Sequence, residues 1–400
     1  MHSLYRHRFN SAFSSDSYHN FVSVLEKEFP GSLDFRIAES PVFIDKAFQR
    51  KLIAACDDII AEISRPDFKN TTERAIPSHQ YVPRENDHTS FIAVDFAVCR
   101  GNDGELEPQL IELQGFPSVF GYQLFLSELF KKRYGLGSPL FYNFIDPNRQ
   151  YETYINALNS VIVGDENPEN VILLEVRPER QKTRIDFAFT ERFWGVKTVC
   201  VSEVLKEGKS LYYQVEGRKI PIRRIYNRVI FDDLQQNADL TPEFQLTDDV
   251  DVTWVGHPNW FFRISKYMLP LLSGPFFPPT KYLSDYRGSF PTDLKNYVLK
   301  PLFSFAGSGV VLHVTRDLLE GIKDPENYIL QRKVDYAPVI ETTDGSKVKA
   351  EIRMLYIWPD SLKKPILVTA LSRLSRGEMI GVRFNKDVTW VGGSAVFFEQ

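Results

Sequence analysis

The sequence is poor in cysteine, in excess charge and in long apolar runs. Its 400 residues include three cysteines, Cys56, Cys99 and Cys200, which form no CxxC pair. This argues against a cysteine zinc site or a disulfide framework and is compatible with a reducing cytoplasm. The formal net charge of −4 provides no basic excess that would bind nucleic acid. No stretch approaches the ~18 apolar residues of a membrane-spanning helix. We therefore expect a cytoplasmic protein with neither a nucleic-acid partner nor a membrane partner.

The N-terminal residues leave one alternative to this localisation. Residues 1–15 carry basic side chains but no apolar core, so they do not form a secretory signal. They are rich in Arg, Ser and His and poor in acids, as organellar transit peptides are. We favour a frayed or docked N-terminus over such a peptide.

The apolar pattern predicts a mixed α/β chain with more than one domain. The length corresponds to roughly two or three domains. Residues 45–64 carry apolar side chains at helical spacing, whereas residues 170–205 have the pattern of strand, helix and strand. That order predicts a βαβ unit with a parallel sheet. Strands dominate after residue 297, and they include predicted strands at 309–314 and 379–384.

A predicted hairpin brings two carboxylates together. Asp103-Gly104 lies between two strand-like runs, which favours a two-residue type I′ turn. The numbers of facing residues would then sum to 207, so Asp95 would face Glu112, with Gln114 on the same side as Glu112. Two carboxylates and an amide oxygen suit Mg²⁺ or Mn²⁺. The alternative is a slipped register in which both acids point to solvent.

A lysine followed by small residues marks the C-terminal third. In YVLKPLFSFAGSGVVLHV, Lys300 lies on a predicted strand, and the loop after it contains Ser304, Gly307, Ser308 and Gly309. Small residues let backbone N–H groups approach an anion, and a lysine supplies a point charge for phosphate. The segment is not a Walker loop, because the lysine precedes the glycines. The alternative is a glycine-rich hairpin with a surface lysine.

The segment AEIRMLYIW carries charge on an otherwise apolar strand. Alternation places Glu351 and Arg353 on one face. Such an arginine would neutralise charge on a transferring phosphoryl group, and the alternative is a structural Glu–Arg pair. Arg373 and Arg376 in the next segment, and the glycine pair in WVGGS, are weaker indications of the same kind.

Taken in order, these motifs resemble the circularly permuted branch of the ATP-grasp superfamily, to which glutathionylspermidine synthetase belongs. VDFAVCRGNDGELEPQLIELQG resembles the metal hairpin of that branch, and NVILLEV through IRRIYNRV resembles its Rossmann-like domain. YVLKPLFSFAGSGV resembles the lysine strand with its phosphate-covering loop, while YILQRKV, AEIRMLYIW and ALSRL resemble the adenine-hinge and arginine strands. The acidic strands precede Lys300, which is the mark of permutation.

The resemblance implies an α/β (α+β) fold of the permuted ATP-grasp type. Residues 1–150 would form an N-terminal segment whose metal hairpin belongs to the ATP-grasp core. Residues 151–265 would form a Rossmann-like pre-ATP-grasp domain, and residues 266–400 would form the nucleotide-binding lobes.

The resemblance also implies a role for each matching residue. The residues expected to hold Mg²⁺ or Mn²⁺ are Asp95, Glu112 and Gln114, although the family usually has Asn at the position of Gln114. The residues expected at ATP are Lys266, Lys300, Ser304, Gly307, Ser308, Gly309, Gln331, Lys333 and Val334. Arg353 would stabilise the γ-phosphoryl group, and Arg84 and Arg228 are candidates for binding a substrate carboxylate.

The activity implied by the resemblance is that of an ATP-dependent carboxylate–amine (or thiol) ligase. A small amino-acid-like or peptide-like carboxylate would attack the γ-phosphorus of ATP. An amine would then displace phosphate from the acyl phosphate. The alternatives are a nucleotide-binding module without catalysis and a phosphotransferase that acts on a hydroxyl.

Overall fold

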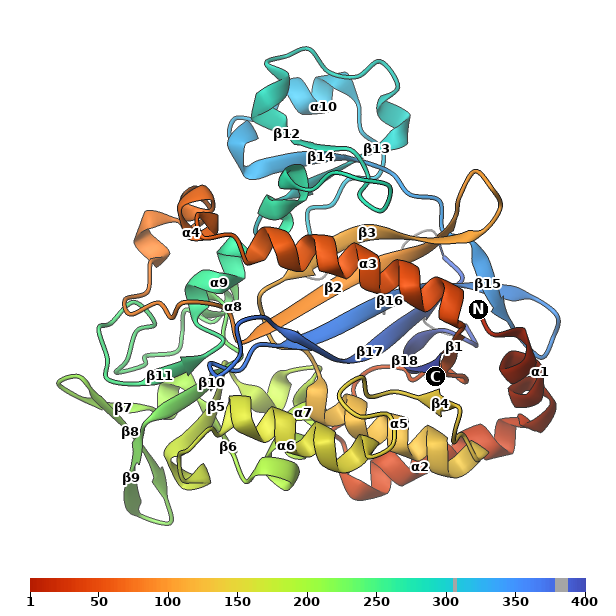
Figure 1. Cartoon of the computed structure of the whole chain (residues 1–400). Helices are drawn as coiled ribbons and strands as arrows, with labels where there is room; N and C mark the ends of the chain where they lie inside the picture. The colour runs from red at the N-terminus through yellow and green to blue at the C-terminus, as the bar shows by residue number, and fades with distance from the viewer. Residues whose placement is uncertain (305–307, 378–387) are drawn as a thin grey trace.

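The computed structural model describes residues 1–304, 308–377 and 388–400. It contains a large mixed sheet, a four-stranded parallel sheet, a small lobe with three strands and a three-stranded meander (Figure 1). The two chain ends lie near each other on one side of the large sheet (Figure 1). Within the described ranges, no helix is long and apolar enough to cross a membrane.

The large sheet joins strands from both ends of the chain. Its main path runs β1 (Val42–Ile44), β18 (Gly392–Glu399), β17 (Ile366–Ser375), β16 (Lys347–Ile357), β2 (Phe91–Arg100) and β3 (Leu106–Gln114). The short strands β15 (Pro338–Glu341) and β4 (Leu140–Phe141) extend it. The pairs from β18 to β3 along this path are antiparallel. The N-terminal hairpin and the C-terminal strands therefore form one layer.

The hairpin has the predicted pair but not the predicted turn. Asp95 faces Glu112, as the sequence predicts. The predicted two-residue turn is wrong, because residues 101–105 connect the paired strands. From Phe96 to the turn, each residue of β2 pairs with a partner one position away from the predicted one. A β-bulge at Ile111 shifts the pairing by one residue, so that Asp95 pairs with Glu112 in the predicted register. The facing pair thus depends on a bulge that the alternation did not reveal.

Helices pack against the large sheet, among them α3 (Lys46–Ile63) and α5 (Phe120–Tyr134). The predicted helix at 45–64 is confirmed as α3 (Lys46–Ile63), which begins at the N-cap Asp45 and crosses the sheet in Figure 1. Its apolar stripe is buried, because the spacing of three and four residues places those side chains on one face. The other long helices are α1 (Ser3–Ala12), α2 (Ser15–Glu28), α5 (Phe120–Tyr134) and α6 (Gln150–Ile162).

The predicted βαβ unit is confirmed by a parallel sheet. Its strands are β11 (Thr253–Val255), β10 (Arg224–Asn227), β5 (Val171–Glu175) and β6 (Lys197–Cys200), all parallel. The helix α7 (Arg184–Trp194) connects β5 to β6. Every residue of β5 is buried, as expected of a strand covered on both faces. The meander attached to this sheet is β7 (Leu205–Glu207), β8 (Ser210–Val215) and β9 (Arg218–Ile222).

The small lobe carries the lysine strand. Its sheet has the order β12 (Thr280–Tyr282), β14 (Tyr328–Arg332) and β13 (Tyr297–Pro301), with α10 (Arg316–Glu320) beside it. The predicted strand at 309–314 is wrong. Only Val311 pairs there, through two backbone hydrogen bonds with Leu299. The predicted strand at 379–384 lies outside the described residues.

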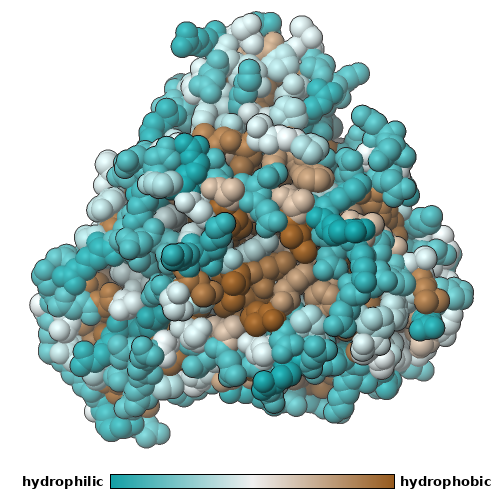
Figure 2. Space-filling model, viewed as in Figure 1, coloured by the Kyte–Doolittle hydropathy of each residue, from teal (hydrophilic) through white to brown (hydrophobic). Residues whose placement is uncertain are grey.

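Three apolar cores correspond to these parts. The largest follows the large sheet and its helices, and a second follows the parallel sheet. A third, with five buried residues among those described, lies in the small lobe. Figure 2 shows apolar residues gathered near the middle of one face, with hydrophilic residues around the rim and over the small lobe. Further short helices are α4 (Phe68–Thr71), α8 (Phe231–Gln236) and α9 (Pro258–Arg263).

Candidate functional site

A pocket of about 510 Å³ lies where the large sheet meets the parallel sheet. One wall comes from β3, β16, β17 and β18, and the opposite wall comes from the carboxyl ends of β5 and β10. Ligands of α/β proteins commonly bind outside the carboxyl ends of parallel strands. Apolar side chains form part of the lining, among them Phe116, Ile230, Phe261, Leu302 and Leu371.

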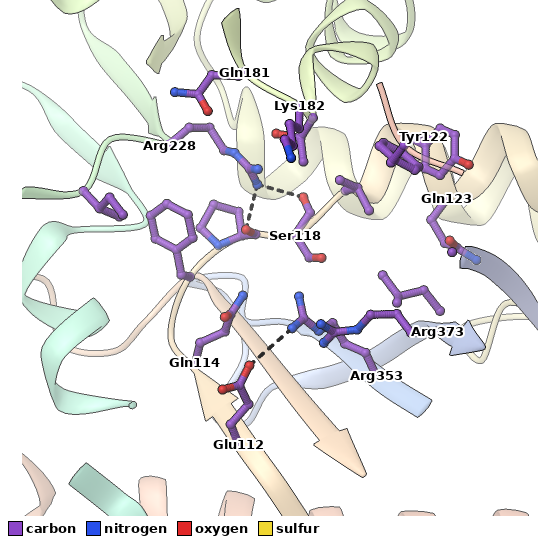
Figure 3. A pocket seen from close by; sticks show the side chains of 18 of the residues that line it. Glu112, Gln114, Ser118, Tyr122, Gln123, Gln181, Lys182, Arg228, Arg353 and Arg373 are labelled. Atoms are coloured by element: carbon purple, nitrogen blue, oxygen red, sulfur yellow. Dashed lines mark hydrogen bonds and ion pairs between the residues drawn. The ribbon is translucent and has the colours of Figure 1, made fainter. Parts of the chain in front are cut away.

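The sheet register assembles a row of charges beside the pocket. Glu112 on β3 faces Asp95 on β2, which faces Arg353 on β16. Arg353 donates to both oxygens of Asp95, from Nε to Oδ1 at 2.6 Å and from Nη2 to Oδ2 at 2.5 Å. This bidentate geometry fixes the guanidinium plane. Figure 3 shows Arg353 reaching toward Glu112, whose Oε1 lies 3.9 Å from Nη2 of Arg353.

A second arginine completes the cluster. Arg373 on β17 faces Glu351 on β16. Its Nη2 lies 2.8 Å from Oδ2 of Asp95 and 2.8 Å from Oε1 of Glu351. The hydroxyl of Tyr336 donates to Oε2 of Glu351 at 3.0 Å. Two buried carboxylates therefore share one arginine, and the predicted Arg353 faces the same pocket.

Burial and charge act in opposite directions on these carboxyls. Burial alone would raise the pKa of Asp95, but the guanidinium groups of Arg353 and Arg373 outweigh it and hold that pKa below its usual value. For Glu351, burial wins and raises the pKa to about 7. Asp95 therefore carries a charge at neutral pH, whereas Glu351 is close to its titration point.

Two lysines approach the same place from the small-lobe side. Lys266 Nζ donates to the backbone oxygen of Ser304 at 2.6 Å and lies 3.8 Å from Oε2 of Glu112. Lys300 is buried, and its Nζ donates to the backbone oxygen of the bulge residue Ile111 at 2.9 Å. Burial lowers the pKa of Lys300 to about 8, although Glu112 acts to raise it. The strand β13 thus brings Lys300 next to β3, across a large separation in sequence.

The donor set does not fit a divalent-cation cage in this arrangement. Both oxygens of Asp95 already accept arginine N–H groups, and Glu112 lies between Arg353 and Lys266. In the described ranges, no group of three His, Cys, Asp or Glu side chains is placed to hold a metal ion. Gln114 lines the pocket and offers a neutral amide (Figure 3). A metal role for Asp95, Glu112 and Gln114 remains a prediction.

The other end of the pocket carries buried acids and an arginine. Glu175, the last residue of β5, is 3% exposed, and burial raises its pKa to about 8. Arg228 follows β10, and its Nη1 donates to the backbone oxygens of Pro117 and Ser118 at 2.7 and 3.0 Å (Figure 3). Its Nε has no hydrogen-bond partner among the described residues. Asp233 also lines this end.

Some predicted residues lie away from the pocket. Arg84 is on the surface, where it forms ion pairs with Asp249 and Asp251, so its proposed contact with a substrate in this pocket has no structural support. Gly307 lies outside the described residues. Asp95 and Lys300 are buried beside the pocket without lining it. The others that do not line the pocket are Ser308, Gly309, Gln331, Lys333 and Val334, whereas Ser304 does line it.

Two further residues were not among the predicted site residues. Arg373 is the one charged residue of β17, and the sequence pattern gave it only as a weaker indication than Arg353. Glu175 closes the run VILLE, and a carboxylate at the carboxyl end of a buried parallel strand is a recognisable signal. Their convergence on one pocket depends on how the two sheets pack.

Comparison with known proteins gives a fold likeness. No protein-family model matches the sequence, and no curated protein matches it either. Among solved structures, a glutathione synthetase-like effector (GSS30) from Globodera pallida, in its apo form, superposes with a TM-score of 0.55 and 12% sequence identity. The match covers 90% of this chain and 94% of that one. At this identity the likeness concerns architecture alone, and this chain shares the overall mixed α/β fold of a glutathione synthetase-like effector.

Proposed function

We propose that the protein is an ATP-dependent ligase that joins a small carboxylate to an amine. The observation that carries this proposal is the convergence of Lys266 and Arg353 on Glu112 at one end of the pocket, with the buried Lys300 bonded to the backbone oxygen of Ile111, the residue before Glu112. These cations come from three parts of the chain. An ion pair that only stabilised the fold would need one cation for Glu112, so the additional cations are available to a negatively charged ligand. A cluster of this kind suits a triphosphate whose charge must be neutralised during phosphoryl transfer.

The chemistry assigned to this end is formation of an acyl phosphate. A substrate carboxylate attacks the γ-phosphorus of ATP, the bond to the bridging oxygen breaks, and ADP leaves. Arg353 and Arg373 are held rigidly by Asp95, so they meet the transferring group without reorganisation. An amine then attacks the acyl carbon and displaces phosphate. Placement of the reactants in one pocket contributes much of the rate.

The opposite end of the pocket supports an amino-acid-like acceptor. Asp233 offers a carboxylate to a protonated amine, the carboxyl of Glu175 offers it a hydrogen-bond acceptor, and Arg228 offers a guanidinium to a carboxylate. A zwitterion satisfies both signs of charge, whereas a simple apolar amine leaves Arg228 unmatched. Phe116 and Phe261 would contact the apolar part of the substrate between the two ends.

A phosphate-release screen tests the proposal. The full chain is incubated with ATP, Mg²⁺ and pools of amino acids and short peptides, and hydroxylamine is added to trap acyl phosphates. Lys300→Met should abolish the release. Lys209→Met is the matched control, because Lys209 is an exposed lysine that pairs with Asp249 and should leave it unchanged. Circular dichroism establishes that both variants fold.

The outcomes separate the alternatives. Phosphate release with a trapped hydroxamate supports the ligase. Phosphate transfer to a hydroxyl without hydroxamate formation favours a phosphotransferase and contradicts the ligase.

A second candidate is a nucleotide-binding module without ligation. The full engagement of Asp95 by two arginines favours it, because that carboxylate is then part of a fixed scaffold. Nucleotide binding without phosphate release for any pool would support this module over the ligase.

A further inference from the structure

We propose that this site binds the triphosphate of ATP without a divalent cation, and that Asp95 and Glu351 are positioning residues for Arg353 and Arg373. The inference rests on the proposed function in one respect, namely that the anion is a nucleotide triphosphate. It goes beyond that function because the lysines and arginines of the protein, and not a bound metal ion, neutralise the charge of the triphosphate.

The first argument is the saturation of Asp95. The side chain is 3% exposed, and its two oxygens accept three hydrogen bonds, at 2.6, 2.5 and 2.8 Å. A divalent ion would have to displace at least one guanidinium from a buried bidentate pair. Such a displacement leaves a charge buried without a partner, which is strongly unfavourable. Asp95 is thus bound as the counter-ion of two arginines.

The second argument concerns the exposure and the contacts of the other two carboxylates, Glu351 and Glu112. Glu351 is 5% exposed and is held by Arg373 and by the hydroxyl of Tyr336. Glu112 is 32% exposed, with cations at 3.8 and 3.9 Å on two sides. A divalent cation placed on Glu112 would be repelled by Lys266 and Arg353. Glu112 would therefore be poorly placed to hold Mg²⁺ in this arrangement.

The third argument is the balance of charge around the pocket end. The carboxylates are Asp95, Glu112 and Glu351. Lys266, Arg353 and Arg373 form ion pairs with them, and Lys300 lies nearby, bonded to the backbone oxygen of Ile111. With all seven groups charged, the balance is one positive charge. Such a cluster attracts a polyanion and disfavours a divalent cation. Free ATP carries more negative charge than its magnesium complex, so the free form should bind at least as tightly.

Isothermal titration calorimetry of the full chain provides the test. The probe is the non-hydrolysable imido analogue of ATP, titrated once in EDTA and once in Mg²⁺. We expect the affinity in EDTA to equal or exceed that in Mg²⁺. Glu112→Gln should tighten binding by up to about fivefold, because it removes a negative charge that faces the anion. Arg373→Gln should weaken binding by roughly tenfold or more, whereas the surface variant Arg84→Gln should bind like the wild type.

The outcomes distinguish this inference from the proposed function. Equal or tighter binding in EDTA, together with tighter binding by Glu112→Gln, supports the inference. Tighter binding in Mg²⁺, or binding that Glu112→Gln weakens, overturns the inference and leaves the nucleotide site standing. Absence of binding under both conditions overturns the inference and the proposed function together. Because Glu112 is partly exposed, its glutamine variant should fold. Whether this variant binds the nucleotide more tightly or more weakly is therefore decided without a change to the buried residues of the cluster.

Discussion

Replacement of Asp95 by asparagine removes one negative charge from beneath two arginines. Asparagine keeps the size of the side chain but presents an amide in place of a carboxylate. The half-buried Arg353 would lose its bidentate partner, and among the described residues Glu351, at 2.8 Å, would remain the acidic partner of Arg373. Removal of one partner from a buried ion pair costs about 3–5 kcal/mol. Arg353 and Arg373 are 14% and 30% exposed and can be partly rehydrated, so we expect a loss near the lower end, about 3 kcal/mol.

Urea denaturation followed by tryptophan fluorescence measures this loss. Four tryptophans belong to the apolar core around the large sheet, so the signal reports mainly on the layer that contains Asp95. The matched control is Asp249→Asn. Asp249 also pairs with two cations, Arg84 and Lys209, but it is 44% exposed. The control should lose far less stability, because exposed ion pairs contribute little.

Acidification gives a second measure of the same effect. The pKa of Asp95 is lower in the folded chain than in the unfolded one. Its contribution is therefore complete above the ordinary aspartate pKa of about 3.9 and is lost as the pH falls through the lower folded pKa. The difference in the free energy of unfolding between the wild type and Asp95→Asn should become smaller in that acidic range. If both asparagine variants lose equal stability at neutral pH, the assignment of Asp95 as a buried counter-ion is refuted.

Three further predictions concern other parts of the pocket. Burial raises the pKa of Glu175 to about 8 from 4.5, so its contribution to stability falls as the pH rises between those values. Glu175→Gln should remove a slope of at most about 1.4 kcal/mol per pH unit in urea titrations, and identical slopes would contradict the burial argument. Gly392→Ala should lower the melting temperature, because its Cβ would lie 2.2 Å from the backbone oxygen of Arg36 and its φ is +122°; an unchanged melting temperature would show that the backbone yields there. Arg228→Gln should raise the KM for the acceptor in the phosphate-release assay, whereas Arg84→Gln should not, and equal effects of the two substitutions would argue against the pocket.

The sequence alone determined helices and strands that depend on residues close together in the chain. Helical spacing predicted the helix that is observed as α3, because apolar residues three and four positions apart face one core. Strand, helix and strand patterns predicted the parallel unit of β5, α7 and β6. The alternation around the hairpin also predicted the facing pair of Asp95 and Glu112, although the turn was wrong and a bulge restored the register.

Only the tertiary structure decided what these charges contact. The same pattern that placed Asp95 opposite Glu112 did not reveal that β16 and β17 bring two arginines to Asp95, because strand order in a sheet depends on contacts between distant segments. The bulge at Ile111, which supplies the oxygen that Lys300 binds, is an irregularity that alternation cannot express. The joining of Glu175 and Arg353 in one pocket likewise follows from the packing of two sheets. Local periodicity fixes which face a side chain takes, whereas its partner is fixed by apolar burial summed over the whole chain.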